Sequence, residues 1–198
     1  MNYLAHAYFS FNHAEILAGN MISDFVKGKT KYDYPPGIQK GIALHREIDA
    51  FTDAHEATKR AKEIFRPHYR LYSGAFIDVA YDYFLANDKT VFTDSSLLKF
   101  SQTTYSMLDE NSKWFPEKFA GMFPYMKSQN WLYNYKSPWG IEKSFGGLVR
   151  RANYLTESVT AFRLFTENIE WLQEQYNYFS GDIKQFAGNR FIDLLNES

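Results

Sequence analysis

Apolar residues along the chain recur mainly at the three- and four-residue intervals that are typical of one face of an α-helix. The pattern is clearest in four segments, which predict helices over residues 37–51, 73–85, 95–108 and 156–179. No run of β-branched residues alternates with polar ones, and no Asn-Gly or Asp-Gly pair indicates a hairpin. The pattern therefore predicts an all-α fold of about seven to nine helices.

The length of 198 residues, with only 11 Gly and 6 Pro, favours one helical domain over residues 1–198. Two segments interrupt the helical pattern and are expected to form loops: 27–36 and the Trp- and Tyr-rich region 115–147. No stretch approaches the roughly 18 apolar residues of a membrane span. The apolar N-terminal residues lack a basic leader region and a small-residue cleavage site. We therefore expect a cytoplasmic protein without a membrane partner.

Charge and cysteine content narrow the possible functions. The chain carries 22 Lys and Arg against 23 Asp and Glu, a net charge of −1. This balance argues against a protein that binds nucleic acid through a strong overall positive charge. The absence of cysteine excludes disulfides, cysteine nucleophiles and thiolate metal ligands. A metal site would therefore use nitrogen and oxygen ligands, which suit Mn²⁺, Mg²⁺, Fe²⁺ or Zn²⁺.

Two pairs of polar residues interrupt apolar helical segments at the same spacing. His45 and Asp49 are four residues apart, and so are Asp78 and Asp82. This spacing places both members of a pair on one helix face. Imidazoles and carboxylates held in this way on rigid helices form divalent-metal sites in helical proteins. The alternative is an ordinary helix-stabilising pair on the surface.

Two further polar residues stand alone in apolar surroundings: His6 within Leu-Ala-His-Ala-Tyr, and Asp24 within Met-Ile-Ser-Asp-Phe-Val. A lone histidine in an apolar helix is often a core residue with an internal hydrogen bond. Together with the two spaced pairs, however, His6 and Asp24 complete a set from which a metal centre could be built. A bound metal would activate water and shield the negative charge of a phosphate.

Four motifs in order carry a resemblance to a known family. They are MNYLAH at 1–6, GNMISDFVKG at 19–28, LHREIDAFTD at 44–53 and IDVAYDYFL at 77–85, with a weaker match, QNWL, at 129–132. This set resembles acyl carrier protein phosphodiesterase, a divergent relative of the HD-domain phosphohydrolases. The resemblance implies an HD-like helical bundle. It also implies hydrolysis of the phosphodiester in holo-acyl carrier protein, giving the apo-protein and 4′-phosphopantetheine.

The resemblance further implies a divalent cation, Mn²⁺ or Mg²⁺, and places the polar residues described above within the family's motifs. The expected metal ligands are His6, Asp24, His45, Asp49, Asp78 and Asp82. The expected catalytic residues are Asp24, His45, Arg46 and Asp49. One departure is that Arg46 follows His45, so the literal His-Asp doublet of HD enzymes is absent. Asp49, or a carboxylate from another motif, would then take its place.

Basic residues are the candidates for contacts with the substrate. Arg46 stands beside His45 and could bind phosphate through two hydrogen bonds, although an ordinary structural ion pair is the alternative. The carrier protein of this family is acidic, so the exposed cations would speed its association. The candidates for docking are Lys27, Lys29, Lys31, Arg150 and Arg151.

Two other functions fit the same sequence features. The first is an HD-like phosphohydrolase that acts on nucleotides or other small phosphoesters. The second is a non-catalytic helical module that binds the carrier protein, another acidic partner or an apolar ligand through aromatic residues crowded between 114 and 139. Most of these aromatic side chains are expected in the core, while several could line a groove for the pantetheine arm. The sequence does not indicate an oligomeric state.

Overall fold

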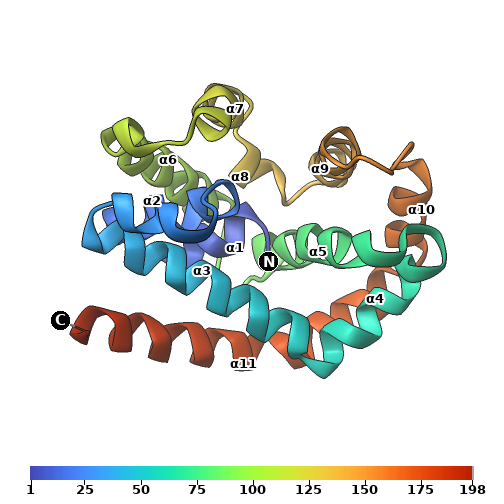
Figure 1. Cartoon of the computed structure of the whole chain (residues 1–198). Coiled ribbons are helices and arrows are strands. Elements are labelled where there is room, and N and C mark those ends of the chain that lie inside the picture. Colours follow the sequence, from blue (N-terminus) through green and yellow to red (C-terminus); the bar gives the residue numbers. More distant parts are fainter. Residues whose placement is uncertain (198) are drawn as a thin grey trace.

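The computed structural model of the chain describes residues 1–197 and confirms the all-α prediction, since no strand occurs within them. The described helices form a single helical domain (Figure 1). The α-helices are α1 (Tyr3–Tyr8), α2 (Ala14–Ile22), α3 (Pro36–Ala54), α4 (Glu56–Tyr69), α5 (Ser73–Asn87), α6 (Asp94–Glu110), α7 (Glu117–Ser128), α8 (Trp131–Asn134), α9 (Pro138–Arg151), α10 (Val159–Glu167) and α11 (Ile169–Asn196). Four 3₁₀-helices join them: η1 (Ser23–Phe25), η2 (Gly28–Asp33), η3 (Arg70–Tyr72) and η4 (Ser112–Trp114).

The short helix α1 lies at the centre of the bundle, against α2 and α5 (Figure 1). Its N-terminus is held by Asp82 of α5, whose buried carboxylate accepts hydrogen bonds from the backbone N–H groups of Asn2, Leu4 and Ala5 at 3.3, 2.7 and 3.2 Å. The first N–H groups of a helix have no partner within the helix, so this carboxylate satisfies them. A six-residue helix, too short to be stable alone, is thereby fixed in the core.

Helices α2 and α3 cross with almost no space between their backbones. A methyl group added at Gly19 would lie 2.0 Å from the carbonyl oxygen of Ile38, and one at Gly41 would lie 2.2 Å from that of Ile16. Only glycine fits at both positions. The close crossing brings the C-terminal end of α2 against the middle of α3, where His45 lies.

Aromatic side chains fix the position of α9 on the other side of the bundle. Phe145 of α9 contacts Phe65 of α4, Phe76 of α5 and Phe165 of α10, with ring centroids 5.1–6.2 Å apart. The edge-to-face arrangement of these rings is the favourable one for aromatic pairs. This cluster holds α9 over α5, near the N-terminus of α1 (Figure 1).

The structure corrects several details of the sequence prediction. Region 115–147, expected to be a loop, contains α7, α8 and most of α9. Pro116 directly precedes α7 and Pro138 is the first residue of α9, positions at which proline is compatible with a helix start. The segment 156–179 is two helices that meet at Asn168, and the second continues to Asn196. The expected loop 27–36 is mostly the 3₁₀-helix η2. The eleven α-helices within residues 1–197 therefore exceed the seven to nine expected.

The bounds of the strongest predicted helices are close to those observed. The segments 37–51, 73–85 and 95–108 correspond to α3, α5 and α6, each longer than expected by a few residues. Among the described residues, no helix combines the length and apolar character that a membrane crossing requires.

Candidate metal centre

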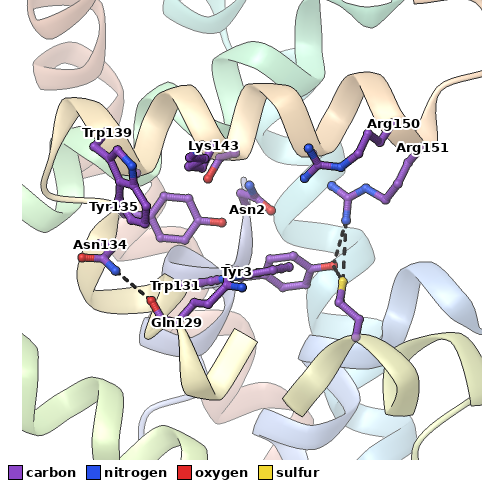
Figure 2. Close-up of a pocket in the computed structure, with 14 residues that line it drawn as sticks. Asn2, Tyr3, Gln129, Trp131, Asn134, Tyr135, Trp139, Lys143, Arg150 and Arg151 are labelled. Atoms are coloured by element: carbon purple, nitrogen blue, oxygen red, sulfur yellow. Dashed lines mark hydrogen bonds between the residues drawn. The ribbon is translucent and has the colours of Figure 1, made fainter. Parts of the chain in front are cut away.

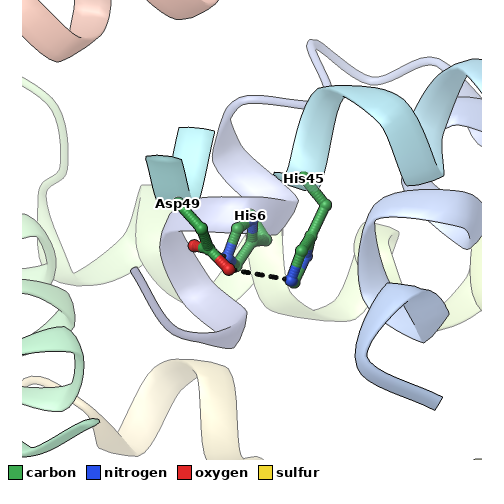
Figure 3. A group of neighbouring side chains, drawn as sticks. All are labelled: His6, His45 and Asp49. Atoms are coloured by element: carbon green, nitrogen blue, oxygen red, sulfur yellow. Dashed lines mark ion pairs between the residues drawn. The ribbon is translucent and has the colours of Figure 1, made fainter. Parts of the chain in front are cut away.

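Three of the predicted ligands come together where α1 meets α3. His6, His45 and Asp49 each offer a ligand atom, and these atoms all lie within 4.8 Å of one another (Figure 3). The two imidazole rings are stacked, with centroids 3.8 Å apart. Nε2 of His6 lies 3.2 Å from one oxygen of Asp49, and Nε2 of His45 lies 3.1 Å from the other. The i, i+4 pair predicted from the sequence thus shares one site with the histidine of α1.

The orientation of His45 is fixed by the backbone of α2. Its Nδ1 lies 2.7 Å from the carbonyl oxygen of Asn20, which can only accept, so Nδ1 donates the hydrogen bond. Nε2 then faces Asp49 Oδ2 and, at 3.2 Å, Asp24 Oδ1. A histidine held through one ring nitrogen by a carbonyl, with the other turned toward carboxylates, has the arrangement typical of a metal ligand.

His6 has a buried imidazole without a hydrogen-bond partner. Within residues 1–197, neither of its ring nitrogens makes a hydrogen bond. Nε2 lies 3.2 Å from an oxygen of Asp49, but the direction of its N–H is unsuited to a hydrogen bond with that oxygen. Buried polar atoms are nearly always paired, so such an atom calls for an explanation. A cation bound between His6, His45 and Asp49 would satisfy it. The residues present therefore fit a divalent metal.

Burial and neighbouring charges act in opposite directions on the pKa values of the cluster. Burial alone would lower the pKa of His45, but the carboxylates of Asp24 and Asp49 outweigh it and raise the pKa to about 9. For His6, burial and the charge of His45 prevail over Asp49 and lower the pKa to about 4. Burial opposes ionisation of Asp49, yet the α-amino group of Met1 and the two imidazoles hold its pKa well below the usual range. Without a metal, His45 thus carries the positive charge between two carboxylates.

This charge distribution makes the stability of the metal-free protein depend on pH. Because the pKa of His45 is about 9 in the folded protein and 6.5 ordinarily, its stabilising effect is complete below pH 6.5 and is lost as the pH rises through 9. Between pH 7 and 9 the loss of this His45 contribution should lower the free energy of unfolding in EDTA by about 2 kcal/mol. The α-amino group of Met1, whose pKa is raised to about 11, adds a further decrease in the same pH range. Urea unfolding at each pH measures this. A His45→Gln variant should show a flatter profile, and an equally steep one would contradict the assignment.

The remaining predicted ligands have different surroundings. Asp24, in η1, has a side chain that is 70% exposed and lies at the open side of the cluster, beside His45. Asp78 accepts a 2.8 Å hydrogen bond from the α-amino group of Met1, which also lies 3.3 Å from Asp49. Burial raises the pKa of Asp78 to about 6, against the effect of that amino group. The positively charged α-amino group of Met1 therefore connects Asp78 to the cluster.

Asp82 lies outside the cluster, and both of its oxygens accept hydrogen bonds from the backbone of α1. Burial raises its pKa to about 7 despite these bonds. Arg46 takes part in no ion pair within the described part of the chain, and its contact with a substrate phosphate stays a prediction. It donates a 2.8 Å hydrogen bond to the carbonyl of Val26 and so fixes the backbone two residues after Asp24.

Sequence reasoning missed Asn20, which positions both histidines. Its backbone carbonyl orients His45, and its side-chain amide donates to the carbonyl of His6 at 2.9 Å and to Ser10 at 3.1 Å. Asn20 is fully buried in an otherwise apolar helix. The same signal that singled out His6 and Asp24 was therefore present at Asn20, inside one of the four motifs.

The helical bundle and its buried His–Asp cluster define the class of the protein: an all-α protein with a centre suited to a divalent metal. Comparison with known sequences gives the family. The sequence model of the acyl carrier protein phosphodiesterase family matches residues 1–183. The chain belongs to this family, as the four motifs indicated.

Curated relatives extend over nearly the whole chain. The acyl carrier protein phosphodiesterase of Yersinia pestis is 30% identical over 194 residues, covering 97% of this chain and all of the relative. That of Klebsiella pneumoniae subsp. pneumoniae is 29% identical over 191 residues, covering 96% and 99%. That of Salmonella paratyphi A is 29% identical over 180 residues, covering 90% and 93%. No solved structure gives a significant match.

Proposed function

We propose that the chain is a divalent-metal-dependent phosphodiesterase. It hydrolyses the bond between 4′-phosphopantetheine and serine in holo-acyl carrier protein, giving the apo-protein and 4′-phosphopantetheine. The family supports the substrate. The observation that carries the metal dependence is the buried His6 without a hydrogen-bond partner, stacked on His45 and facing Asp49.

His6, His45 and Asp49 would hold the cation, with Asp24 at its open side and Asp78 near it. This set of imidazole nitrogens and carboxylate oxygens suits Mn²⁺ or Mg²⁺, and Fe²⁺ or Zn²⁺ would also fit it. When bound, the cation would supply Lewis-acid activation of water and neutralise charge on the phosphodiester.

The chain's own residues would position the reactants. The water oxygen forms a bond to phosphorus, the bond from phosphorus to the serine oxygen breaks, and that oxygen takes up a proton. Asp24 is the accessible carboxylate beside the cluster, and the hydrogen bond from His45 lowers its pKa against the effect of burial. It is therefore ionised at neutral pH and able to accept a proton from water. Arg46 holds the backbone after Asp24, and its exposed guanidinium remains available to phosphate.

The lysines of the segment after Asp24 are suited to guide an acidic carrier protein. Lys27 and Lys29 are exposed, Lys31 is half-buried, and none of the three takes part in an ion pair among residues 1–197. Lys27 is three residues from Asp24, so the segment that carries these charges directly follows the residue at the open side of the cluster. Such charges act mainly on the rate of association.

Reversing the three lysines to glutamate should lower kcat/KM at low salt by about tenfold and leave kcat nearly unchanged. The remaining salt dependence should also weaken, because exposed charges are screened over about 8–10 Å at physiological ionic strength. Steady-state kinetics with holo-carrier protein at several salt concentrations measures both effects.

The matched control reverses three exposed lysines outside this segment, Lys89, Lys99 and Lys118, so that the net charge changes equally. This control should retain most of the wild-type kcat/KM. If both triple variants lose kcat/KM to the same extent, only net charge matters and docking is not at 27–31.

A substrate panel tests the proposed function against the nucleotide alternative. Purified protein with Mn²⁺ is given holo-carrier protein, nucleoside mono- and triphosphates, and bis-p-nitrophenyl phosphate at equal concentrations. The proposal expects holo-carrier protein to have the highest kcat/KM by at least about 100-fold. Nucleotide hydrolysis at a comparable or higher kcat/KM would overturn the assignment of the substrate.

A further inference from the structure

A cavity of about 230 Å³ lies between α8 and α9, beside the N-terminus of α1 (Figure 2). Four aromatic side chains and Met122 form its apolar part; the aromatic residues are Tyr3, Trp131, Tyr135 and Trp139. Side-chain amides contribute hydrogen-bonding groups: Asn2, Gln129 and Asn134. A cavity with apolar walls and a few polar groups is typical of a small-molecule site.

Cationic side chains without an acidic partner line the same cavity. Lys143, Arg150 and Arg151 project from α9 along it (Figure 2). None of the ion pairs formed within residues 1–197 involves these three side chains, although eight other lysines and arginines are paired. Within residues 1–197, the guanidinium of Arg151 donates hydrogen bonds to the hydroxyl of Tyr3, at 3.5 Å, and to the sulfur of Met122, at 3.9 Å. These charges are therefore free to bind an anion.

The cavity adjoins the candidate metal centre through α1. Tyr3, which lines the cavity, precedes His6 by three residues, so both side chains lie on the same side of this short helix. Asn2 follows Met1, whose α-amino group contacts Asp49 and Asp78. The end of the cavity at Tyr3 and Arg151 is therefore the end nearest to the cluster.

We propose that this cavity binds the pantetheine arm of the substrate, with Arg150 and Arg151 on its phosphate; this inference rests on the proposed function. The arm has an apolar dimethyl group, two amides and a terminal thiol. It therefore needs apolar walls and amide hydrogen-bond partners, and both occur here. With the phosphate at the cluster, the arm extends past Tyr3 between Trp131 and Trp139.

Gly147 offers a way to fill the cavity without disturbing the fold. It lines the cavity in α9, and a methyl group added there meets no atom closer than 3.7 Å, the Nη2 of Arg150. Gly147→Leu should therefore fold, with a melting temperature no lower than that of the wild type, and should project a side chain into the cavity. Gly181→Leu is the matched control, because Gly181 is an exposed glycine within α11 with open space around it.

The first readout is the direct binding of free 4′-phosphopantetheine and of pantetheine. Calorimetry and tryptophan fluorescence measure the affinity. Wild type and Gly181→Leu should bind 4′-phosphopantetheine equally, and Gly147→Leu at least tenfold more weakly. Arg151→Gln should weaken binding of 4′-phosphopantetheine but not of pantetheine. Equal binding by Gly147→Leu and wild type, or no binding by the wild type, would overturn the inference.

The second readout is hydrolysis of holo-carrier protein, where Gly147→Leu should raise KM at least tenfold. If Gly147→Leu does not fold, Trp139→Ala replaces it and tests the cavity by removing one of its apolar walls. The side chain of Trp139 lines the cavity and is 52% exposed, so its loss should leave the fold intact. If the wild type hydrolyses holo-carrier protein and Gly147→Leu has an unchanged KM, the cavity does not bind the pantetheine arm. The proposed function would then still hold. Binding of 4′-phosphopantetheine without hydrolysis of the carrier would reject the function and retain the cavity.

Discussion

Replacing His45 with alanine should reduce kcat/KM for holo-carrier protein by about 10³-fold or more. The variant loses a candidate metal ligand whose Nε2 faces two carboxylates. Residues that only support metal ligands already cost roughly 10–100-fold when they are mutated, so a ligand should cost more. Binding of Mn²⁺, measured by calorimetry, should weaken in parallel, and a circular dichroism spectrum should retain the helical signal.

The control for this variant is His68→Ala, which changes an exposed histidine in α4 outside the cluster. It should keep wild-type kinetics and Mn²⁺ affinity. Undiminished hydrolysis by His45→Ala, with His68→Ala as the reference, would contradict the assignment of the site.

The second large effect concerns folding rather than catalysis. Gly41→Ala should lower the free energy of unfolding by about 3 kcal/mol, because the added methyl group would lie 2.2 Å from the carbonyl oxygen of Ile16. The two helices would have to move apart, and this would also displace Asn20 from His45. Urea unfolding and Mn²⁺ affinity measure the two consequences.

Gly121→Ala in α7 is the matched change in an open position, where an added methyl group meets nothing within 4 Å. This variant should be more stable than the wild type by roughly 0.5–1 kcal/mol, since alanine is favoured over glycine within a helix. If Gly41→Ala were equally stabilised, the close crossing of α2 and α3 would not be needed to build the site.

The helices that the sequence predicts well are those with a regular apolar stripe, such as α3 and α5. The helices within region 115–147 are not predicted, because aromatic residues occur in helices and loops alike and obscure the helical pattern there. In addition, Pro124 lies inside α7, where proline normally indicates a break. The separation of α10 from α11 at Asn168 was also missed, since apolar residues continue at helical spacing across it.

For the site, the sequence predicts which residues share a face of one helix, but it does not predict which helices contact one another. The His45–Asp49 pair follows from the sequence because both residues lie on α3. The stacking of His6 on His45 depends on how α1 is placed, and that is decided by hydrogen bonds from its backbone to Asp82. No spacing rule distinguishes a carboxylate that caps a neighbouring helix from one that binds metal. The Asp78–Asp82 pair has the same four-residue spacing as the His45–Asp49 pair. The sequence therefore predicts metal ligands in both pairs.

The central claim, that a divalent cation at this cluster is required to cleave holo-carrier protein, is tested most directly by mass spectrometry of the carrier. Protein stripped of metal with EDTA and then dialysed is incubated with holo-carrier protein, and Mn²⁺ is added in increasing amounts. We expect no change without metal and, with Mn²⁺, conversion of the carrier to its apo mass with release of 4′-phosphopantetheine. Full conversion by the stripped protein, or none at any Mn²⁺ concentration, would contradict the account.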